Sequence, residues 1–286
     1  KLQYTVKRSA VEIFKEGGFV GEQVVTVLAG LKAQAGGKLV EPVTETLAFG
    51  EPIPGVQYIG AGSIIPSGQT AVLPLRSFNV GQVTLTAWGI QRDNLHQFFQ
   101  VNDLPQEREF HRVGSQIWKK DYSLGNAKAI KNKRLVTGLD ISPLIRRYPK
   151  GLVRLEVKFT KKDVLASCSE EEDEEDNYYS YYDCDEGQKR DPCHKCFYMR
   201  QRQQLTRNFV VSNIGLIAKK IEQDKLFVAT SNLRTARPLG GSRITVYNFV
   251  KEVVGTGRTD SQGIARISLK DGPYLVVAES GSDASY

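Results

Sequence analysis

Several residue types that mark particular protein classes are scarce in this chain of 286 residues. It has one methionine, three histidines and four cysteines, which argues against a histidine-rich metal store and against a disulfide-dense mini-protein. No stretch approaches the roughly 18 consecutive apolar residues of a membrane span, and the first eight residues lack the apolar core of a signal peptide. Because the first residue is not methionine, we expect a mature product or an excised fragment of a longer protein.

Motifs that mark the common enzymes are also missing. The chain contains no Gly-x-Ser-x-Gly, no phosphate-binding loop, no Gly-x-Gly-x-x-Gly and no His-Glu-x-x-His. Residues can converge in space without a motif, so these absences argue only against the usual catalytic solutions. We predict that the chain is not an enzyme and that it uses no cofactor.

The net charge of +7 conceals two parts of opposite sign. Residues 170–186 contain ten acids and no base, so the other 269 residues carry 39 bases against 22 acids. A surplus of that size permits nucleic-acid binding. However, the bases are scattered, and the short runs at 128–134 and 200–207 lack the interleaved aromatic residues of a stacking surface. We therefore predict no nucleic-acid partner.

Short alternating segments dominate the chain and favour β-strands. They are rich in β-branched and aromatic residues, and most lie near a turn signal: 23–29, 83–88, 153–159, 244–247 and 274–278. Two short connector helices are expected, at 92–100 with Asp93 as a cap and at 141–147 with Ser142 as N-cap and Pro143 in the first turn. The sequence predicts an all-β chain of consecutive antiparallel β-sandwiches with short connector helices.

The C-terminal part has the most regular pattern. We expect strands near 209–218, 224–231, 242–249, 252–258, 264–269 and 273–279. The clearest hairpin is 253–269, which turns at 260–263, where Asp260 and Gly263 occupy the positions that a type I turn prefers. Residues 50–69 are rich in glycine and proline and predict a loop or a seam between two units.

Four blocks near the C-terminus occur in the order typical of a known domain. They are 209–216 (FVVSNIGL), 229–239 (ATSNLRTARPL), 257–265 (GRTDSQGIA) and 272–278 (GPYLVVA). In this order they resemble the third macroglobulin-like domain of bacterial α2-macroglobulins. Upstream, 73–80, 94–99, 139–142 and 150–152 resemble the second such domain, and residues 1–68 resemble the end of the first.

This resemblance implies macroglobulin-type sandwiches and a division of the chain. Residues 1–68 would end a first unit, 69–206 would form a second with a cysteine-rich acidic hairpin arm at about 160–200, and 207–286 would form a third. It also implies a large protein of the Gram-negative periplasm, attached to the inner membrane, if at all, by an anchor outside this segment. In that family a bait region is cut and the molecule then changes shape around the protease. Both the bait and the reactive region are expected downstream of these domains.

The four cysteines lie within 29 residues, and several kinds of chemistry compete for them. Cys168-Ser169-Glu170-Glu171 lacks the final Gln of the thioester motif, so it offers no activated acyl group. Zinc would need a second Cys-x2-Cys pair, and Cys193-x-x-Cys196 lacks the strand-to-helix context of a redox site. With the exported compartment that the resemblance implies, we favour two structural disulfides. We expect the nested pairing, Cys168 with Cys196 and Cys184 with Cys193, across a hairpin arm formed by 153–166 and 197–205.

The acidic run is the most unusual feature. Seven consecutive acids predict a solvated loop tip. The alternative is a docking surface for a basic partner or for another domain of the same protein, with tyrosines adding contact area. A calcium site is weaker, because the spacing of an EF-hand is absent. The candidate contact residues are Glu170, Glu171, Glu172, Asp173, Glu174, Glu175, Asp176, Tyr178, Tyr179, Tyr181 and Tyr182.

Two functions follow from these observations. The first is a structural segment of a periplasmic protease inhibitor of the α2-macroglobulin type, whose partners would be proteases, bound through the full-length protein, and other domains of the same chain. The second is a β-sandwich binding module of an envelope complex or adhesin that recognises another periplasmic protein through the acidic arm. An enzyme or metal protein built on the cysteine cluster is a third, weaker hypothesis.

Overall fold

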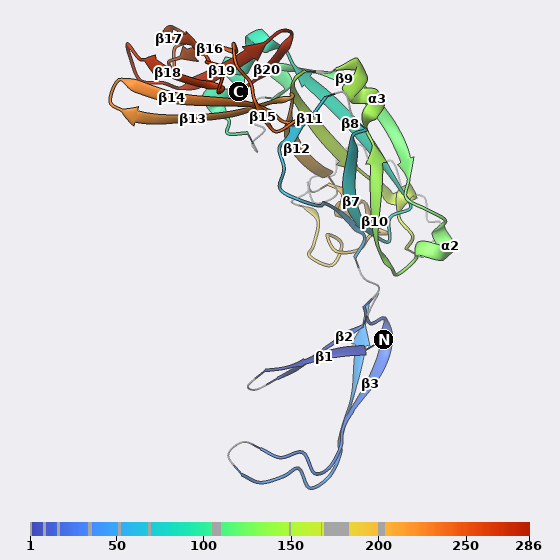
Figure 1. Ribbon diagram of the computed structural model, residues 1–286. Coiled ribbons are helices and arrows are strands. Elements are labelled where there is room, and N and C mark those ends of the chain that lie inside the picture. The colour runs from blue at the N-terminus through green and yellow to red at the C-terminus, as the bar shows by residue number, and fades with distance from the viewer. Residues whose placement is uncertain are drawn as a thin grey trace.

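The computed structural model describes most of the chain: residues 2–7, 10–15, 18–33, 36–50, 53–67, 70–104, 110–148, 150–166, 168, 183–199 and 204–286. Strands make up nearly all of its regular structure and pair in six sheets. Four of these sheets form two sandwiches, while two hairpins near the N-terminus lie apart from them (Figure 1). The predicted all-β class is confirmed, and every pairing between named strands is antiparallel except that of β6 (Ile64–Ile65) with β12 (Gln204–Val211).

The middle sandwich packs a three-stranded sheet on a five-stranded one. The first sheet has the order β10 (Arg134–Asp140), β7 (Val72–Phe78) and β5 (Gly55–Tyr58). The second has the order β6, β12, β11 (Gly151–Lys158), β8 (Gln82–Ile90) and β9 (Gly114–Ser123). Alternate residues of β7, β8 and β11 point into one core, where Leu75, Leu85 and Leu155 are fully buried. The period-2 pattern seen in the sequence thus places one face of each sheet inside.

The C-terminal sandwich has the same two-layer plan. One sheet pairs β14 (Lys225–Asn232) with β13 (Ile214–Glu222), β15 (Arg237–Pro238) and β18 (Ile264–Ser268). The other has the order β17 (Val253–Arg258), β16 (Arg243–Tyr247), β19 (Leu275–Ser280) and β20 (Asp283–Ser285). Its core includes Ile214, Val228 and Ile244.

The hairpin predicted for 253–269 was wrong. The turn at 260–263 exists, because Gly263 N–H donates to Asp260 C=O at 2.9 Å. However, β17 pairs with β16 and β18 pairs with β14, so the turn carries the chain from one sheet to the other. A turn sequence fixes the local reversal but does not decide whether the two strands pair with each other.

The strand pairings also cross both expected domain limits. β5 and β6, from residues expected to end the first unit, pair with β7 and β12 of the middle sandwich. β12 extends to Val211 in the sheet of that sandwich, whereas a boundary at 206 and a single strand at 209–218 were expected. The chain passes between the two sandwiches at Ser212–Asn213.

The two N-terminal hairpins are β1–β2 (Leu2–Val6, Val11–Lys15) and β3–β4 (Gly21–Val27, Val43–Phe49). Most of their residues are exposed. Apolar side chains alternate along β1, where Leu2, Tyr4 and Val6 share one face but are each more than 60% exposed. The alternation is therefore that of a sandwich strand, although its apolar face is exposed among the described residues.

The helices are short connectors, as predicted. They are η1 (Arg92–Asn94), α1 (Leu95–Val101), η2 (Phe110–Arg112), α2 (Ala127–Ile130), α3 (Ser142–Arg147), η3 (Lys161–Asp163) and α4 (Lys195–Tyr198). Two predicted caps were wrong: the cap residue of α1 is Asn94 rather than Asp93, and the side chain that binds the start of α3 is Asp140, which accepts from Ser142 N–H at 2.9 Å. None of the described helices has both the length and the apolar character to cross a membrane.

Candidate functional site

The cysteine-rich segment is inserted between two neighbouring strands. β11 and β12 are antiparallel, and Lys158 at the end of β11 is opposite Gln204 at the start of β12. The segment therefore leaves and re-enters the five-stranded sheet at the same end. Its return includes helix α4, where a strand had been expected.

All four cysteines form disulfides, as predicted, but the nested pairing was wrong. The structure joins Cys168 to Cys193 and Cys184 to Cys196, with Cα–Cα distances of 5.2 and 5.9 Å. The two bridges therefore interleave along the sequence. The reason is helix α4. Cys196 lies in this helix and is buried, and it meets the buried Cys184. Cys193 precedes the helix and is only partly buried. The direction of a four-residue helix thus decides which cysteine reaches which partner.

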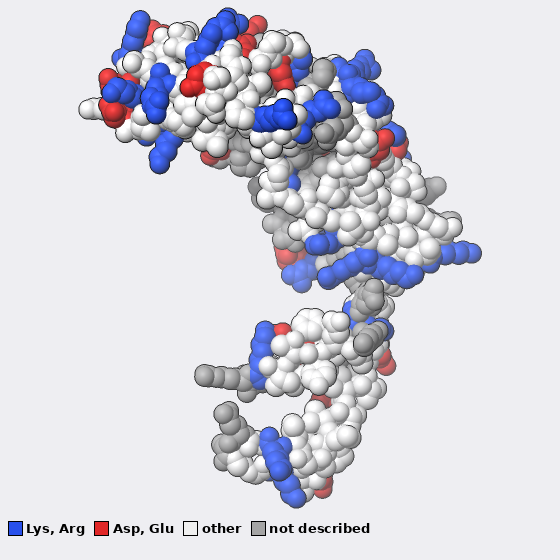
Figure 2. Space-filling model, viewed as in Figure 1, with Lys and Arg blue, Asp and Glu red and all other residues white. Residues whose placement is uncertain are grey.

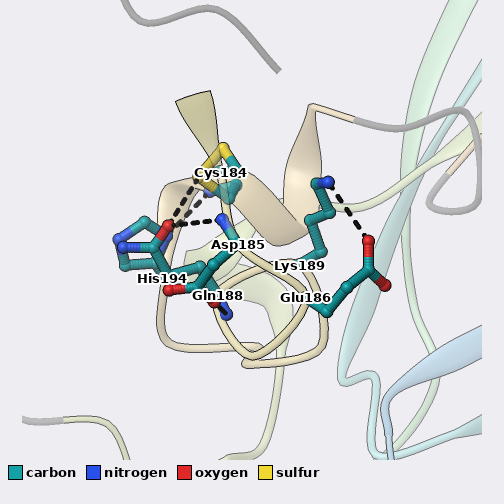
Figure 3. Close-up of a disulfide and its surroundings, with 7 residues drawn as sticks. Cys184, Asp185, Glu186, Gln188, Lys189 and His194 are labelled. Carbon is teal, nitrogen blue, oxygen red and sulfur yellow. Dashed lines mark hydrogen bonds and ion pairs between the residues drawn. A yellow bond between two sulfur atoms is a disulfide. The ribbon is translucent and has the colours of Figure 1, made fainter. Parts of the chain in front are cut away.

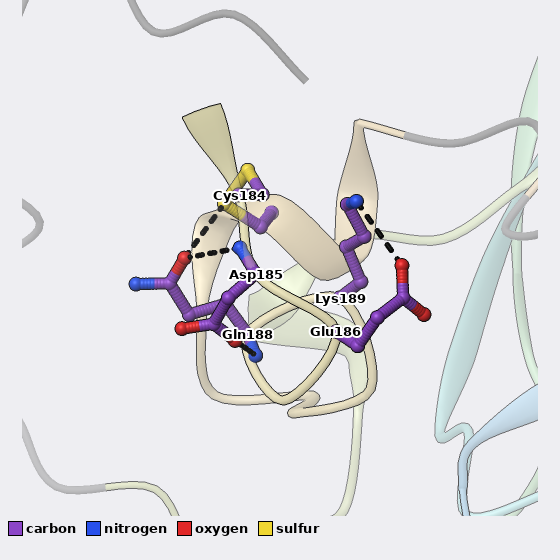
Figure 4. Close-up of polar contacts among 6 residues, drawn as sticks. Cys184, Asp185, Glu186, Gln188 and Lys189 are labelled. Atoms are coloured by element: carbon purple, nitrogen blue, oxygen red, sulfur yellow. Dashed lines mark hydrogen bonds and ion pairs between the residues drawn. A yellow bond between two sulfur atoms is a disulfide. The ribbon is translucent and has the colours of Figure 1, made fainter. Parts of the chain in front are cut away.

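Local hydrogen bonds hold the segment between the bridges (Figure 3). Asp185 N–H donates to Gln188 Oε1 at 3.0 Å, and Gln188 N–H donates back to Asp185 Oδ1 at 2.8 Å. At the start of α4, the Nδ1 atom of His194 accepts from Cys196 N–H at 3.1 Å. Figure 4 shows the same turn, with the ion pair of Lys189 and Glu186 at 3.2 Å. Backbone groups near the bridges are thus satisfied by side chains of the same segment.

Helix α4 fastens the segment to the middle sandwich. Phe197 is buried and belongs to the main core cluster of this sandwich. Tyr198 packs edge-on against Phe159, with ring centroids 6.3 Å apart, and its hydroxyl donates to Pro192 C=O at 2.6 Å. The disulfides therefore tie their loops to a helix that is itself anchored in a hydrophobic core.

This geometry leaves little room for reactive chemistry at the cysteines. Cys168 is bonded to Cys193, so it has no thiolate with which to form a thioester. Cys193 and Cys196 are bonded to other cysteines and not to each other, so they do not form the dithiol of a redox motif. Within the described ranges, no group of three or more His, Cys, Asp or Glu side chains is arranged to hold a metal ion. The segment is built as a stapled loop.

The candidate contact residues of the acidic run cannot be placed on this site. Glu170, Glu171, Glu172, Asp173, Glu174, Glu175, Asp176, Tyr178, Tyr179, Tyr181 and Tyr182 lie outside the described residues. Their attachment points can be placed: Cys168 on one side, and Asp183 and Cys184 on the other.

A second site, which the sequence analysis missed, is the seam where α1 of the middle sandwich meets the C-terminal sandwich. His96 is buried, and its Nε2 lies 2.9 Å from Asn248 C=O. Because a carbonyl only accepts, this imidazole nitrogen must carry the proton. Gln100 donates to Phe249 C=O at 2.7 Å, and the ammonium of Lys251 donates to Asp93 C=O at 3.0 Å. Backbone carbonyls are the acceptors in all three contacts, so no pattern of side-chain types in the sequence could have revealed them.

Carboxylates reinforce both sides of the seam. Asp283 accepts from Ser212 Oγ at 3.0 Å and from Asn213 N–H at 2.8 Å, at the point where the chain passes between the sandwiches. Asp271 accepts from the Asn248 side chain at 3.1 Å. Hydrogen bonds from Gly272 N–H and from Asn248 hold the pKa of Asp271 below its usual value of 3.8.

Two phenols and one further carboxyl have shifted pKa values for simple physical reasons. Burial raises the pKa of Tyr58, whose hydroxyl donates to Leu155 C=O at 3.1 Å inside the middle sandwich. Burial, aided by the nearby charge of Asp140, raises the pKa of Tyr122 to about 12. Hydrogen bonds from the side chain and the N–H of Ser142 lower the pKa of Asp140. These groups stabilise structure, and none of them titrates near neutral pH.

Solved structures of bacterial alpha-2-macroglobulins share this fold. A crystal structure of the native Escherichia coli protein spanning domains MG0-NIE-MG1 aligns with a TM-score of 0.58 and 14% identity, covering 99% of this chain and 79% of that one. A crystal structure of a Salmonella alpha-2-macroglobulin mutant aligns with a TM-score of 0.52 and 15% identity, covering 99% of this chain and 15% of that one. At these identities the likeness concerns the fold alone.

Sequence relationships are more specific. Residues 211–286 match the bacterial alpha-2-macroglobulin MG3 domain. Two alpha-2-macroglobulins of Xylella fastidiosa, from strains 9a5c and Temecula1, are 27% and 26% identical over 280 residues. The matches cover 91% of this chain but only 14% of each relative, so the chain spans about one seventh of their length. The chain is thus similar to bacterial alpha-2-macroglobulins along most of its length, and its last 76 residues match their MG3 domain.

Proposed function

We propose that this chain is the N-terminal structural segment of an alpha-2-macroglobulin-like protease inhibitor in the periplasm of a Gram-negative bacterium. The observation that carries the proposal is the sequence match along 91% of the chain to two alpha-2-macroglobulins of Xylella fastidiosa. The partners would be proteases, bound through the full-length protein, and other domains of the same protein. The contribution of this segment would be mechanical and not catalytic.

The seam supports a mechanical role. It joins two sandwiches that each have their own core, through contacts from α1 and from Asp283. Most of these contacts are hydrogen bonds, and several of them end on backbone carbonyls. Because hydrogen bonds are directional, they favour one relative orientation of the two sandwiches. A frame that closes around a protease needs domains that keep such an orientation while other parts of the molecule move.

The test uses the full-length parent protein and a protease that cleaves both a large protein substrate and a small peptide. A trap blocks the large substrate by enclosure and leaves the peptide accessible. We expect the parent protein to abolish cleavage of the large substrate while peptide cleavage continues, and a variant without residues 1–286 to lose this discrimination. Equal inhibition of both substrates by the parent protein, or trapping that survives the deletion, would overturn the proposal.

A further inference from the structure

One end of the middle sandwich is formed by three loops that are hydrogen-bonded to one another. Leu165 N–H, in the loop that follows β11, donates to Asn79 C=O at 2.9 Å, and Gly81 N–H donates to Asp163 C=O at 2.7 Å. The amide side chain of Asn79 accepts from Asn132 N–H at 2.6 Å, in the loop between α2 and β10. The loops around 79–81, 124–134 and 158–165 therefore form one continuous surface.

This surface is basic. Its exposed bases are Lys128, Lys133, Arg134, Lys158 and Lys162, and we call these five residues the basic end. Figure 2 shows lysine and arginine side chains gathered along the edge of the middle sandwich where Figure 1 places α2. The acid within these loops, Asp163, is 8% exposed and accepts hydrogen bonds from the N–H and the hydroxyl of Thr160. It therefore offers little opposing charge at the surface.

The disulfides fix both attachment points of the acidic run close to this surface. Cys168 follows Leu165 by three residues and is bonded to Cys193, while Cys184 is bonded to Cys196 in α4. Helix α4 packs through Tyr198 on Phe159, the residue that follows the last residue of β11. Glu170 is five residues from Leu165, so about 17 Å of extended chain separates them at most. The acids start within reach of the basic end.

We propose that the basic end is an intramolecular docking surface for the acidic residues 170–176 of the same chain. Seven acids face five exposed bases, and attachment at both ends confines the acids to a small volume, equivalent to a millimolar local concentration. Individually weak surface ion pairs then suffice to favour the docked arrangement at low salt. This inference does not depend on the proposed protease inhibition.

Chymotrypsin cleavage after Tyr178, Tyr179, Tyr181 and Tyr182 tests the proposal, because docking of the neighbouring acids limits access to these tyrosines. The basic-end variant is Lys128→Glu, Lys133→Glu and Arg134→Glu. At low salt we expect cleavage in the variant to be about three- to ten-fold faster than in the unmodified chain, as expected for the loss of several surface ion pairs. In 1 M NaCl, where the screening length falls to about 3 Å, the two rates should coincide. Cut sites are assigned by mass spectrometry on the full chain.

A matched control reverses three exposed lysines of the C-terminal sandwich, Lys219, Lys220 and Lys270. It should cleave like the unmodified chain, and circular dichroism should show that all variants are folded. A charge-swap variant, in which all five bases of the basic end are changed to Glu and all seven acids of 170–176 are changed to Lys, should recover the slow rate. Equal low-salt rates for the unmodified chain and the basic-end variant would overturn the proposal. Equal acceleration by the control, or no recovery in the charge swap, would overturn it as well.

Discussion

The turn at Gly263 gives the sharpest test of how the C-terminal sandwich is built. Gly263 has φ +73°, and a Cβ atom added to it would lie 2.3 Å from Thr230 C=O and 3.0 Å from Leu239 N. The backbone passes this close because Thr230 N–H donates to Gly263 C=O at 2.7 Å and Leu239 N–H donates to Thr230 C=O at 3.0 Å. Only glycine combines the positive φ with an approach to two other backbone segments.

The cost of Gly263→Ala has two parts. A left-handed conformation costs a non-glycine residue about 1–2 kcal/mol. The contact at 2.3 Å is with the backbone oxygen of Thr230, so the clash is relieved only if the turn moves away from β14. That movement weakens the two hydrogen bonds of Thr230 just described, which are worth about 0.5–1.5 kcal/mol each. The sum is about 2–5 kcal/mol. Gly281→Ala is the matched control, because Gly281 has φ +57° but no atom within 4 Å of its added Cβ, and strain alone should cost about 1–2 kcal/mol.

Both tryptophans lie in the middle sandwich, Trp88 on β8 and Trp118 on β9, so tryptophan fluorescence does not report on this change. Amide hydrogen exchange measured by mass spectrometry on peptides from β14 and β18 does. The two variants should differ by the weakened hydrogen bonds, about 1–3 kcal/mol, which corresponds to about 5- to 150-fold faster exchange in Gly263→Ala. If Gly263→Ala exchanges no faster than Gly281→Ala, the close approach of the three segments is wrong.

Two further predictions concern the disulfides and acid stability. The chain-entropy model assigns about 3.5 kcal/mol to a 25-residue loop and about 3 kcal/mol to a 12-residue loop. Even so, the free energy of unfolding in urea should fall more for Cys184→Ser with Cys196→Ser than for Cys168→Ser with Cys193→Ser. The reason is that only the first pair leaves two buried hydroxyls. The reverse order would show that loop closure dominates. The pKa of Asp271 is lowered in the folded state, so its stabilisation is present above its unfolded pKa of about 3.8 and is lost as pH falls through its lower folded value. Urea midpoints between pH 5 and 2 should therefore fall less steeply for Asp271→Asn than for the unmodified chain, and parallel curves would contradict this.

Strands and core positions could be predicted because one physical pattern determines both. In β8 and β11, alternate apolar side chains must point to one side of the sheet, and that side is buried in the structure. The same pattern at residues 2–6 predicts a sandwich strand, and β1 forms there with its apolar face exposed. Periodicity therefore reports which face is made for burial, whereas the partner that covers it depends on segments distant in sequence.

Pairing between distant elements could not be predicted for the same reason. Residues 253–258 and 264–268 have a good turn between them, yet β17 pairs with β16 and β18 pairs with β14, so the two strands enter different sheets. The seam contacts of His96, Gln100 and Lys251 end on carbonyl groups. Every residue has such a group, so these contacts carry no compositional signal.

The disulfide pairing shows how a small local element decides a long-range connection. The nested pairing was expected because residues 197–205 would return as a strand opposite 153–166. Instead His194 caps a short helix, and this turn buries Cys196 beside Phe197 while leaving Cys193 near the surface. Interleaved bridges follow, and they constrain the loop differently. A nested outer bridge would close the whole arm at its base, whereas the interleaved bridges bind each end of the acidic run separately to the region of one anchored helix. The two points at which the acidic run is attached are therefore set by the cysteine topology and not by distance along the sequence.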